Sequence, residues 1–184
     1  MDERARNVGH AFDTSDMDHD GYLDHRDIIV VATSLCERLG LSDQGSRLVR
    51  NAYERVWRYA VRHIGTDSHG RISRESYIDY ALAPERDRTE FVANVVWPIT
   101  NALWDALDAD GDERLDRAEY LRLWAAYDVA AEASRESYDR LRGKKVAHVS
   151  KAGFAQAMYD YYYRSAAAAP ILGDGWISPR SGPC

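Results

Sequence analysis

The sequence predicts a compact all-α protein made of four helix–loop–helix motifs arranged in two pairs. Two twelve-residue segments, 16–27 and 108–119, carry acidic residues at the same spacing. Segments 65–76 and 142–153 have lost most of those acidic residues but keep an apolar residue at the eighth position. Between these segments apolar residues recur at intervals of three and four, which is the period of an amphipathic helix. A helix–loop–helix unit repeated four times explains all three observations.

Length and composition allow a substantial core and argue against several kinds of partner. The chain has 184 residues, of which 45% are hydrophobic and 11% aromatic, enough for one large domain or two small lobes. Its net charge is -6, and the acidic residues concentrate in the two segments. The basic residues are scattered, so no nucleic-acid-binding surface is predicted. No apolar run approaches the roughly 20 residues that span a bilayer, and no signal peptide is visible, so we expect no membrane contact and a cytoplasmic location.

The first acidic segment, D-M-D-H-D-G-Y-L-D-H-R-D over 16–27, matches the spacing of an EF-hand calcium loop. Calcium takes six to eight oxygen ligands, and a tightly wound loop aims alternate side chains at one point. Gly21 at position 6 permits the sharp turn, and Leu23 is the apolar residue at position 8. An acidic, solvated loop between two helices is the alternative. The predicted ligands are the carboxylates of Asp16, Asp18 and Asp20, the backbone carbonyl of Tyr22, Asp24 directly or through water, and the closing Asp27.

The second acidic segment, D-A-D-G-D-E-R-L-D-R-A-E over 108–119, repeats the pattern with Leu115 at position 8. Position 6 is Glu113 rather than glycine, so a residue with a Cβ must adopt the positive φ of the turn, at a cost of about 1 kcal/mol. Calcium binding is therefore expected to be weaker than in an ideal loop. The predicted ligands are Asp108, Asp110, Asp112, the backbone carbonyl of Arg114, Asp116 and the bidentate Glu119.

EF-hands pair through a short strand contact between their position-8 residues, so each acidic loop should have a partner. Ile72 in segment 65–76 and Val149 in segment 142–153 occupy that position. Both segments lack the ligand set, and the last one has no acidic residue. It contains three lysines instead, whose positive charges repel a cation: Lys144, Lys145 and Lys151. We therefore predict two metal sites, in the first and third motifs, within an N-terminal pair (1–83) and a C-terminal pair (84–165).

Apolar periodicity predicts the helices that connect these loops. The first helical face after the first loop is formed by Ile28, Ala32, Leu35 and Leu39, and the next by Val49, Tyr53, Val56, Trp57, Ala60 and Ile64. A third helix is expected from Pro98 to Leu107, because proline fits the first residue of a helix. Helices should end at Gly40 and near Pro84, the latter being the boundary between the pairs. Cys36, in an apolar helical pattern, is expected in the core.

The last segment, 166–184, has a different composition and is predicted to be a tail. It contains four alanines followed by several prolines and glycines. Its apolar residues are costly to leave in water, so we expect the tail to pack on the body, with a disordered tail as the alternative. These residues are Ile171, Leu172, Trp176 and Ile177.

The four-motif layout, with ligand-rich first and third loops, a ligand-poor second loop and a Gly/Trp-containing tail, resembles the calerythrin and sarcoplasmic calcium-binding proteins. The resemblance implies a compact helical protein with two EF-hand pairs and a calcium-buffering role. The chain departs from the bacterial calerythrin pattern in its fourth motif, where ligands are expected and none remain. The preference for arginine over lysine suits a bacterium with a GC-rich genome.

These features favour an intracellular calcium buffer or signal modulator over a calcium sensor that regulates a protein partner. Sensors present a Met-rich groove when they open, whereas this chain has 3 Met against 12 Tyr and 5 Trp. Trp57, Trp97, Trp104 and Trp124 are predicted to form a fixed core, with Trp176 of the tail filling any groove. A sensor with an unidentified protein target is the alternative. No catalytic motif is present, so we predict no enzyme.

The closing residue of the first loop predicts a difference in metal selectivity. Asp27 is one methylene shorter than glutamate and reaches the ion through one oxygen, which lowers the coordination number. The first site is thus predicted to accept both Ca²⁺ and Mg²⁺, and the third to prefer Ca²⁺.

Overall fold

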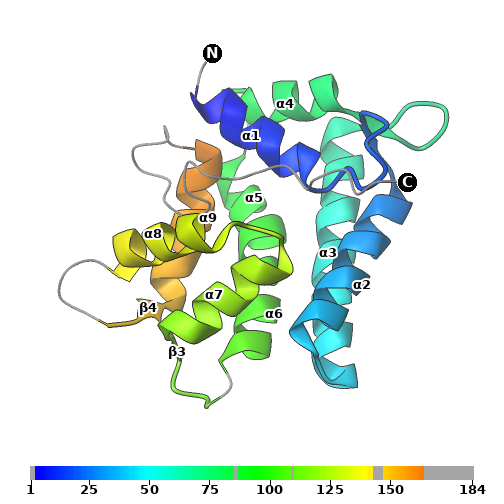
Figure 1. The fold of residues 1–184 in the computed structure, drawn as a ribbon. Coiled ribbons are helices and arrows are strands. Elements are labelled where there is room, and N and C mark those ends of the chain that lie inside the picture. The colour runs from blue at the N-terminus through cyan, green and yellow to red at the C-terminus, as the bar shows by residue number, and fades with distance from the viewer. Residues whose placement is uncertain (1–2, 85–86, 109, 143–146, 164–184) are drawn as a thin grey trace.

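The computed structural model describes residues 3–84, 87–108, 110–142 and 147–163, and most of its described residues are helical (Figure 1). The all-α prediction is confirmed, whereas the predicted packing of the tail lies outside the described residues. The N-terminal half contains α1 (Glu3–Asp13), β1 (Tyr22–Leu23), α2 (His25–Leu39), α3 (Asp43–Ile64), β2 (Ile72–Ser73) and α4 (Arg74–Leu82). The C-terminal half contains α5 (Arg88–Phe91), η1 (Val92–Val96), α6 (Trp97–Leu107), β3 (Arg114–Leu115), α7 (Arg117–Ala126), α8 (Ala131–Arg142), β4 (Val149–Ser150) and α9 (Lys151–Tyr163).

Local sequence signals fix the ends of several helices. Gly40 ends α2 in the left-handed conformation (φ 60°), where glycine lacks the Cβ that would clash. Both this end and the predicted end near Pro84 are confirmed, since α4 stops at Leu82. Pro98 lies in the first turn of α6 as predicted. However, the helical path already begins at Arg88 and reaches α6 through the π-helical segment η1. A proline without an N–H is compatible with such a local change of hydrogen-bond pattern.

In each half, one short antiparallel pair of strands joins the two loops. Leu23 lies opposite Ile72 in the β1–β2 pair, and Leu115 lies opposite Val149 in the β3–β4 pair. All four side chains are buried. The predicted pairing through position 8 is confirmed in both halves, so each acidic loop is tied to a loop that has lost its ligands.

The two halves share one hydrophobic core. The largest cluster combines Leu35 and Val49 of the N-terminal half with Leu103, Leu123 and Phe154 of the C-terminal half. Figure 1 shows α3 alongside α2, with α6 on its other side, and α3 makes extensive contacts with both helices. The pairs of motifs therefore touch along their length.

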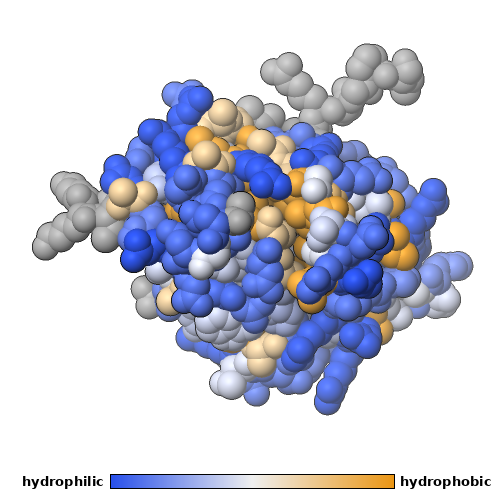
Figure 2. Space-filling view, turned by 90° about the horizontal axis from the view of Figure 1, so that it is seen from below, coloured by the Kyte–Doolittle hydropathy of each residue, from blue (hydrophilic) through white to orange (hydrophobic). Residues whose placement is uncertain are grey.

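Most predicted core residues are buried, but two of the four tryptophans predicted for the core are not, since Trp57 is half-buried and Trp97 is exposed. Cys36, Trp104 and Trp124 are buried, but Trp97 is 41% exposed. Trp97 stands at the start of α6, just where the π-helical segment ends. Other large hydrophobic residues with exposed side chains are Met17, Ile29, Val30 and Leu48. Figure 2 shows a face on which hydrophobic residues reach the surface between hydrophilic ones. No helix in the described part of the chain is long and apolar enough to cross a membrane.

Candidate metal centres

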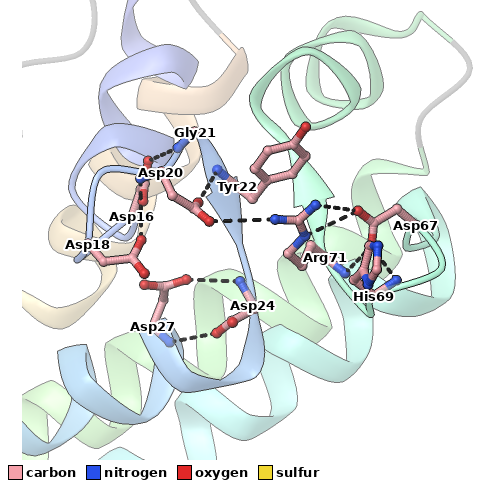
Figure 3. A network of polar contacts seen from close by, with 10 residues as sticks. All are labelled: Asp16, Asp18, Asp20, Gly21, Tyr22, Asp24, Asp27, Asp67, His69 and Arg71. Carbon is pink, nitrogen blue, oxygen red and sulfur yellow. Dashed lines mark hydrogen bonds and ion pairs between the residues drawn. The ribbon is translucent and has the colours of Figure 1, made fainter.

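The first loop brings three of its predicted ligands together. Asp16, Asp18 and Asp27 each place one carboxylate oxygen within 4.8 Å of the others. Asp16 precedes β1, and Asp27 lies in the first turn of α2, so the loop folds its two ends onto each other (Figure 3). Asp16 and Asp27 are each only 6% exposed, whereas Asp18 is exposed. Two of the three carboxylates are thus largely withdrawn from water.

Asp16 has one carboxylate oxygen without a protein partner. Its Oδ2 accepts a hydrogen bond from the backbone N–H of Gly21 at 3.0 Å, but its buried Oδ1 has no hydrogen-bond partner. Burial raises the pKa of Asp16, against the effect of the Gly21 hydrogen bond, because a buried carboxylate is poorly solvated. A buried anionic oxygen without a donor is costly. A hard divalent cation between these carboxylates satisfies that oxygen, so the donor set fits calcium or magnesium.

Asp24 and Asp27 also fix the start of α2. The Asp24 side chain accepts from the backbone N–H groups of Arg26 and Asp27, and the Asp27 side chain accepts from the Asp24 N–H at 2.9 Å. This reciprocal capping box holds both residues at the loop exit. The second Asp27 oxygen accepts from the Met17 N–H at 3.1 Å, and burial raises the pKa of the carboxyl. The capping role was missed by the sequence prediction, although the D-x-x-D spacing signals it.

Asp20, a predicted ligand, lies apart from the three clustered carboxylates and faces a cation from the second motif. Its Oδ1 accepts from the Tyr22 N–H at 2.8 Å, and its Oδ2 lies 3.7 Å from the Arg71 guanidinium (Figure 3). The Arg71 guanidinium also stacks over the Tyr22 ring, 4.0 Å from its centroid. Arg71 was not predicted to contribute to the first site. It stands at position 7 of the partner loop, and the β1–β2 pair carries it across.

The second loop is organised by an internal ion pair. Asp67 accepts hydrogen bonds from the backbone N–H groups of His69 and Arg71, and from the Arg71 guanidinium at 3.1 and 3.2 Å. The backbone N–H of Arg71 contributes most to holding the pKa of Asp67 below its usual value. The guanidinium thus supplies the positive charge that a metal supplies in a ligand-rich loop.

The third loop gathers a comparable group of carboxylates closer to solvent. Asp108, Asp110 and Asp112 place oxygens within 4.8 Å of one another. The Asp108 carboxylate accepts from the N–H groups of Asp112 and Glu113, each at 3.0 Å. Asp110 and Asp112 are exposed, in contrast to the buried pair of the first loop. The first group joins loop positions 1, 3 and 12, whereas the third joins positions 1, 3 and 5 without the predicted closing ligand Glu119, and the first group is more deeply buried.

The closing residues of the third loop repeat the capping arrangement of the first. Asp116 caps α7 by accepting from the Glu119 N–H at 2.9 Å, and Glu119 Oε2 accepts from the Asp116 N–H at 3.0 Å. Arg114, whose carbonyl is a predicted ligand, begins β3 and donates its N–H to Asp112 Oδ1 at 2.9 Å. The two ends of the loop are therefore fixed by hydrogen bonds of the same kind as in the first loop.

Both acidic loops turn through the left-handed region at positions 4 and 6. Glu113 has φ 59°, as predicted from its place at position 6, and Gly111 at position 4 has φ 72°. In the first loop Gly21 has φ 83°, and His19 at position 4 has φ 58°. Each loop thus places one residue with a Cβ in a conformation that favours glycine.

The described residues contain no further group of clustered metal ligands. His25 Nε2 lies 2.6 Å from the Glu54 carboxylate at the surface. In the fourth motif the described part, from residue 147 onward, carries no acidic residue before α9.

The sequence matches no protein-family model and no curated protein sequence. The structure is similar to a calcium-binding protein from Streptomyces coelicolor that is described as acting in prokaryotic calcium-mediated regulation. The two share 22% sequence identity with a TM-score of 0.74, and the match covers 87% of this chain and 98% of that one. It is also similar to the coelenterazine-binding protein of Renilla muelleri, with 19% identity, a TM-score of 0.65, and coverage of 93% and 95%.

A third similar structure is the ctenophore photoprotein berovin, whose three calcium-binding loops bind magnesium ions. It has 19% identity, a TM-score of 0.68, and coverage of 85% of this chain and 87% of that one. At these identities the likeness establishes the fold. The chain therefore has the all-α EF-hand fold of calcium-binding proteins.

Proposed function

We propose that this protein binds calcium through its first and third loops and acts as an intracellular calcium buffer or signal modulator. The observation that carries the proposal is the buried Asp16 Oδ1, which has no partner and belongs to a group of three carboxylates with oxygens within 4.8 Å of one another. The equivalent group in the third loop supports a second site. We also propose a relationship to the calerythrin and sarcoplasmic calcium-binding proteins, which the ligand-rich first and third loops and the ligand-poor second loop support.

A buffer is favoured over a sensor because the interior is filled with aromatic side chains. Trp104 and Trp124 are buried and contact other rings, and Tyr120 packs against both Trp124 and Tyr138. Such rings are stiffer than the methionines with which sensors adapt to their targets. The Streptomyces coelicolor neighbour, a protein of calcium-mediated regulation, supports the alternative of a sensor with a protein partner.

The first site is proposed to accept magnesium as well as calcium. Both Asp27 oxygens are engaged with backbone N–H groups of the loop, at 3.1 and 2.9 Å, so the short side chain has little freedom to turn both of them to an ion. Lower coordination suits six-coordinate magnesium better than calcium. Magnesium binding by the loops of berovin is in line with this proposal.

A calorimetric calcium titration of metal-free protein, with and without millimolar magnesium, tests the function. Two binding events are expected, one of them weakened by magnesium. The double variants D16N/D18N and D108N/D110N should each remove one event and leave the other. Binding of a hydrophobic dye, followed in the same samples, should change little for a buffer and increase strongly for a sensor. Absence of saturable calcium binding would overturn the proposal.

A further inference from the structure

A cavity of about 160 Å³ lies between the two halves and is lined by residues of both. Its wall includes Tyr53 and Trp57 of α3, Trp124 and Tyr127 around the end of α7, and Met158 of α9. The cavity therefore lies within the interface that joins the two pairs of motifs, and Leu23 of the first acidic loop forms part of its wall.

The lining is apolar and rich in rings. Eight of its twenty residues are aromatic, and most of the others are aliphatic. Thr14 and Ser15 also line it, but both hydroxyls donate to the carbonyl of Ala11 and are satisfied locally. Protein interiors rarely keep voids larger than a water molecule, and an apolar cavity of about 150 Å³ stays dry and accepts benzene. The space is thus suited to one aromatic ring with a small substituent.

One polar feature stands in this apolar wall. The hydroxyl groups of Tyr53 and Tyr127 form a mutual hydrogen bond of 2.6 Å. Two hydroxyl groups carry two protons, and the mutual bond uses only one of them. Burial raises the pKa of both groups, that of Tyr127 to about 12, so both protons are present at neutral pH. In the described residues no acceptor is seen for the second proton, which is costly in a site without water.

We propose that the cavity binds a small aromatic molecule with a single hydrogen-bond acceptor, such as a carbonyl oxygen. This oxygen accepts a hydrogen bond from the second hydroxyl group of the Tyr53–Tyr127 pair. The ring packs against the aromatic lining, where offset and edge-to-face contacts add to apolar burial. The hydroxyl pair fixes the orientation of the ligand, as a few placed polar groups do in apolar pockets.

A titration with two probes of equal shape tests the site. Acetophenone carries a carbonyl acceptor, and α-methylstyrene replaces that oxygen with a methylene group. Each is added to the full-length, ¹⁵N-labelled protein, and binding is followed by NMR shifts of the tryptophan indole and backbone amide signals. Both probes should bind saturably. In the double variant Y53F/Y127F the affinity for acetophenone should fall about 5- to 10-fold, the effect of one hydrogen bond, while that for α-methylstyrene should stay within 2-fold.

Cavity-filling variants show where the probes bind. Ala60→Leu and, as a second choice in case the first does not fold, Ala11→Leu place extra carbons at the cavity wall and should abolish binding of both probes. Ala125→Leu makes the same change at an exposed position of α7 and should leave binding unchanged. The proposal is overturned if neither probe binds, as when another part of the chain fills the cavity. It is also overturned if binding survives the filling variants, or if Y53F/Y127F affects both probes equally.

Discussion

At the scale of single residues, the two acidic loops adopt the same left-handed turns but have glycine at different positions. Both turn left-handed at positions 4 and 6. The first loop has glycine at position 6 and His19 at position 4, whereas the third has glycine at position 4 and Glu113 at position 6. Each loop therefore retains one strained residue. The strain in the third loop is accessible to a direct test because Glu113 is exposed.

Replacing Glu113 with glycine should stabilise the third loop. A left-handed residue with a Cβ costs about 1–2 kcal/mol, while glycine adds about 0.5–1 kcal/mol of unfolded-state entropy. The net gain in unfolding free energy should be about 0.5–1 kcal/mol, measured by urea denaturation of the metal-free protein. Glu113→Gln is the control, since it removes the charge and keeps the Cβ. A gain of equal size in both variants would assign the effect to charge and contradict the strain argument.

The closing residues of the two sites should set their preference between calcium and magnesium. Asp27→Glu lengthens the side chain by one methylene group and should raise the calcium-to-magnesium affinity ratio at the first site, because a bidentate carboxylate favours the larger ion. Glu119→Asp makes the reciprocal change and should lower the ratio at the third site. Competition calorimetry measures both ratios. If neither metal changes affinity in Asp27→Glu, the length of the closing residue does not determine selectivity.

At the scale of elements, the ligand-poor second motif places a positive charge beside the acidic loop of the first motif. The β1–β2 pair places Arg71 between Asp67 of its own loop and Asp20 of the first loop. Through its ion pair with Asp67, the Arg71 guanidinium gives the second loop a positive charge of its own. The Asp20 contact places the same positive charge beside a predicted calcium ligand, where it opposes an incoming divalent cation.

Arg71→Gln should therefore tighten calcium binding at the first site. We expect an increase of about 3- to 10-fold at low ionic strength, corresponding to about 1 kcal/mol, and a smaller one at 0.5 M salt because screening weakens exposed charges. Calcium titrations of D108N/D110N protein with and without Arg71→Gln isolate this site. Arg74→Gln is the charge-matched control, since Arg74 pairs with Asp13 outside the loop. Weaker calcium binding in Arg71→Gln would show instead that the arginine positions Asp20.

Signals within one element were readable from the sequence, while contacts between elements mostly were not. Gly40 was predicted as a helix end because a left-handed C-cap has a local signature, and Ile72 as a pairing residue because the loop spacing fixes its register. Arg71 carries no such signature. Its role depends on the direction of a long side chain across a strand pair, which composition and spacing leave open. The exposure of Trp97 likewise follows from the π-helical segment before α6, for which the sequence has no simple pattern.

At the scale of the whole molecule, the shared core connects the two acidic loops. The first loop leads into α2, and the third into α7, and both helices belong to the same hydrophobic cluster. Residues such as Leu39 and Val49 are buried by partners from both halves. Pro84 divides the sequence repeat, but the core continues across it. The free energy of calcium binding at one loop should therefore stabilise both halves against unfolding.

Calcium bound at a single site should raise the melting temperature of the entire chain in one transition. A ligand that binds only the folded state adds about 2.7 kcal/mol at a concentration of 100 times its dissociation constant. In D16N/D18N and in D108N/D110N protein, calcium should shift one calorimetric peak whose calorimetric and van't Hoff enthalpies agree. Near-ultraviolet circular dichroism of the tryptophans should follow the same midpoint. The fragment 1–83 alone lacks most of the shared core and should not melt cooperatively. Two separate peaks, of which calcium moves only one, would instead show that the halves fold independently and that the shared core contributes little coupling between them.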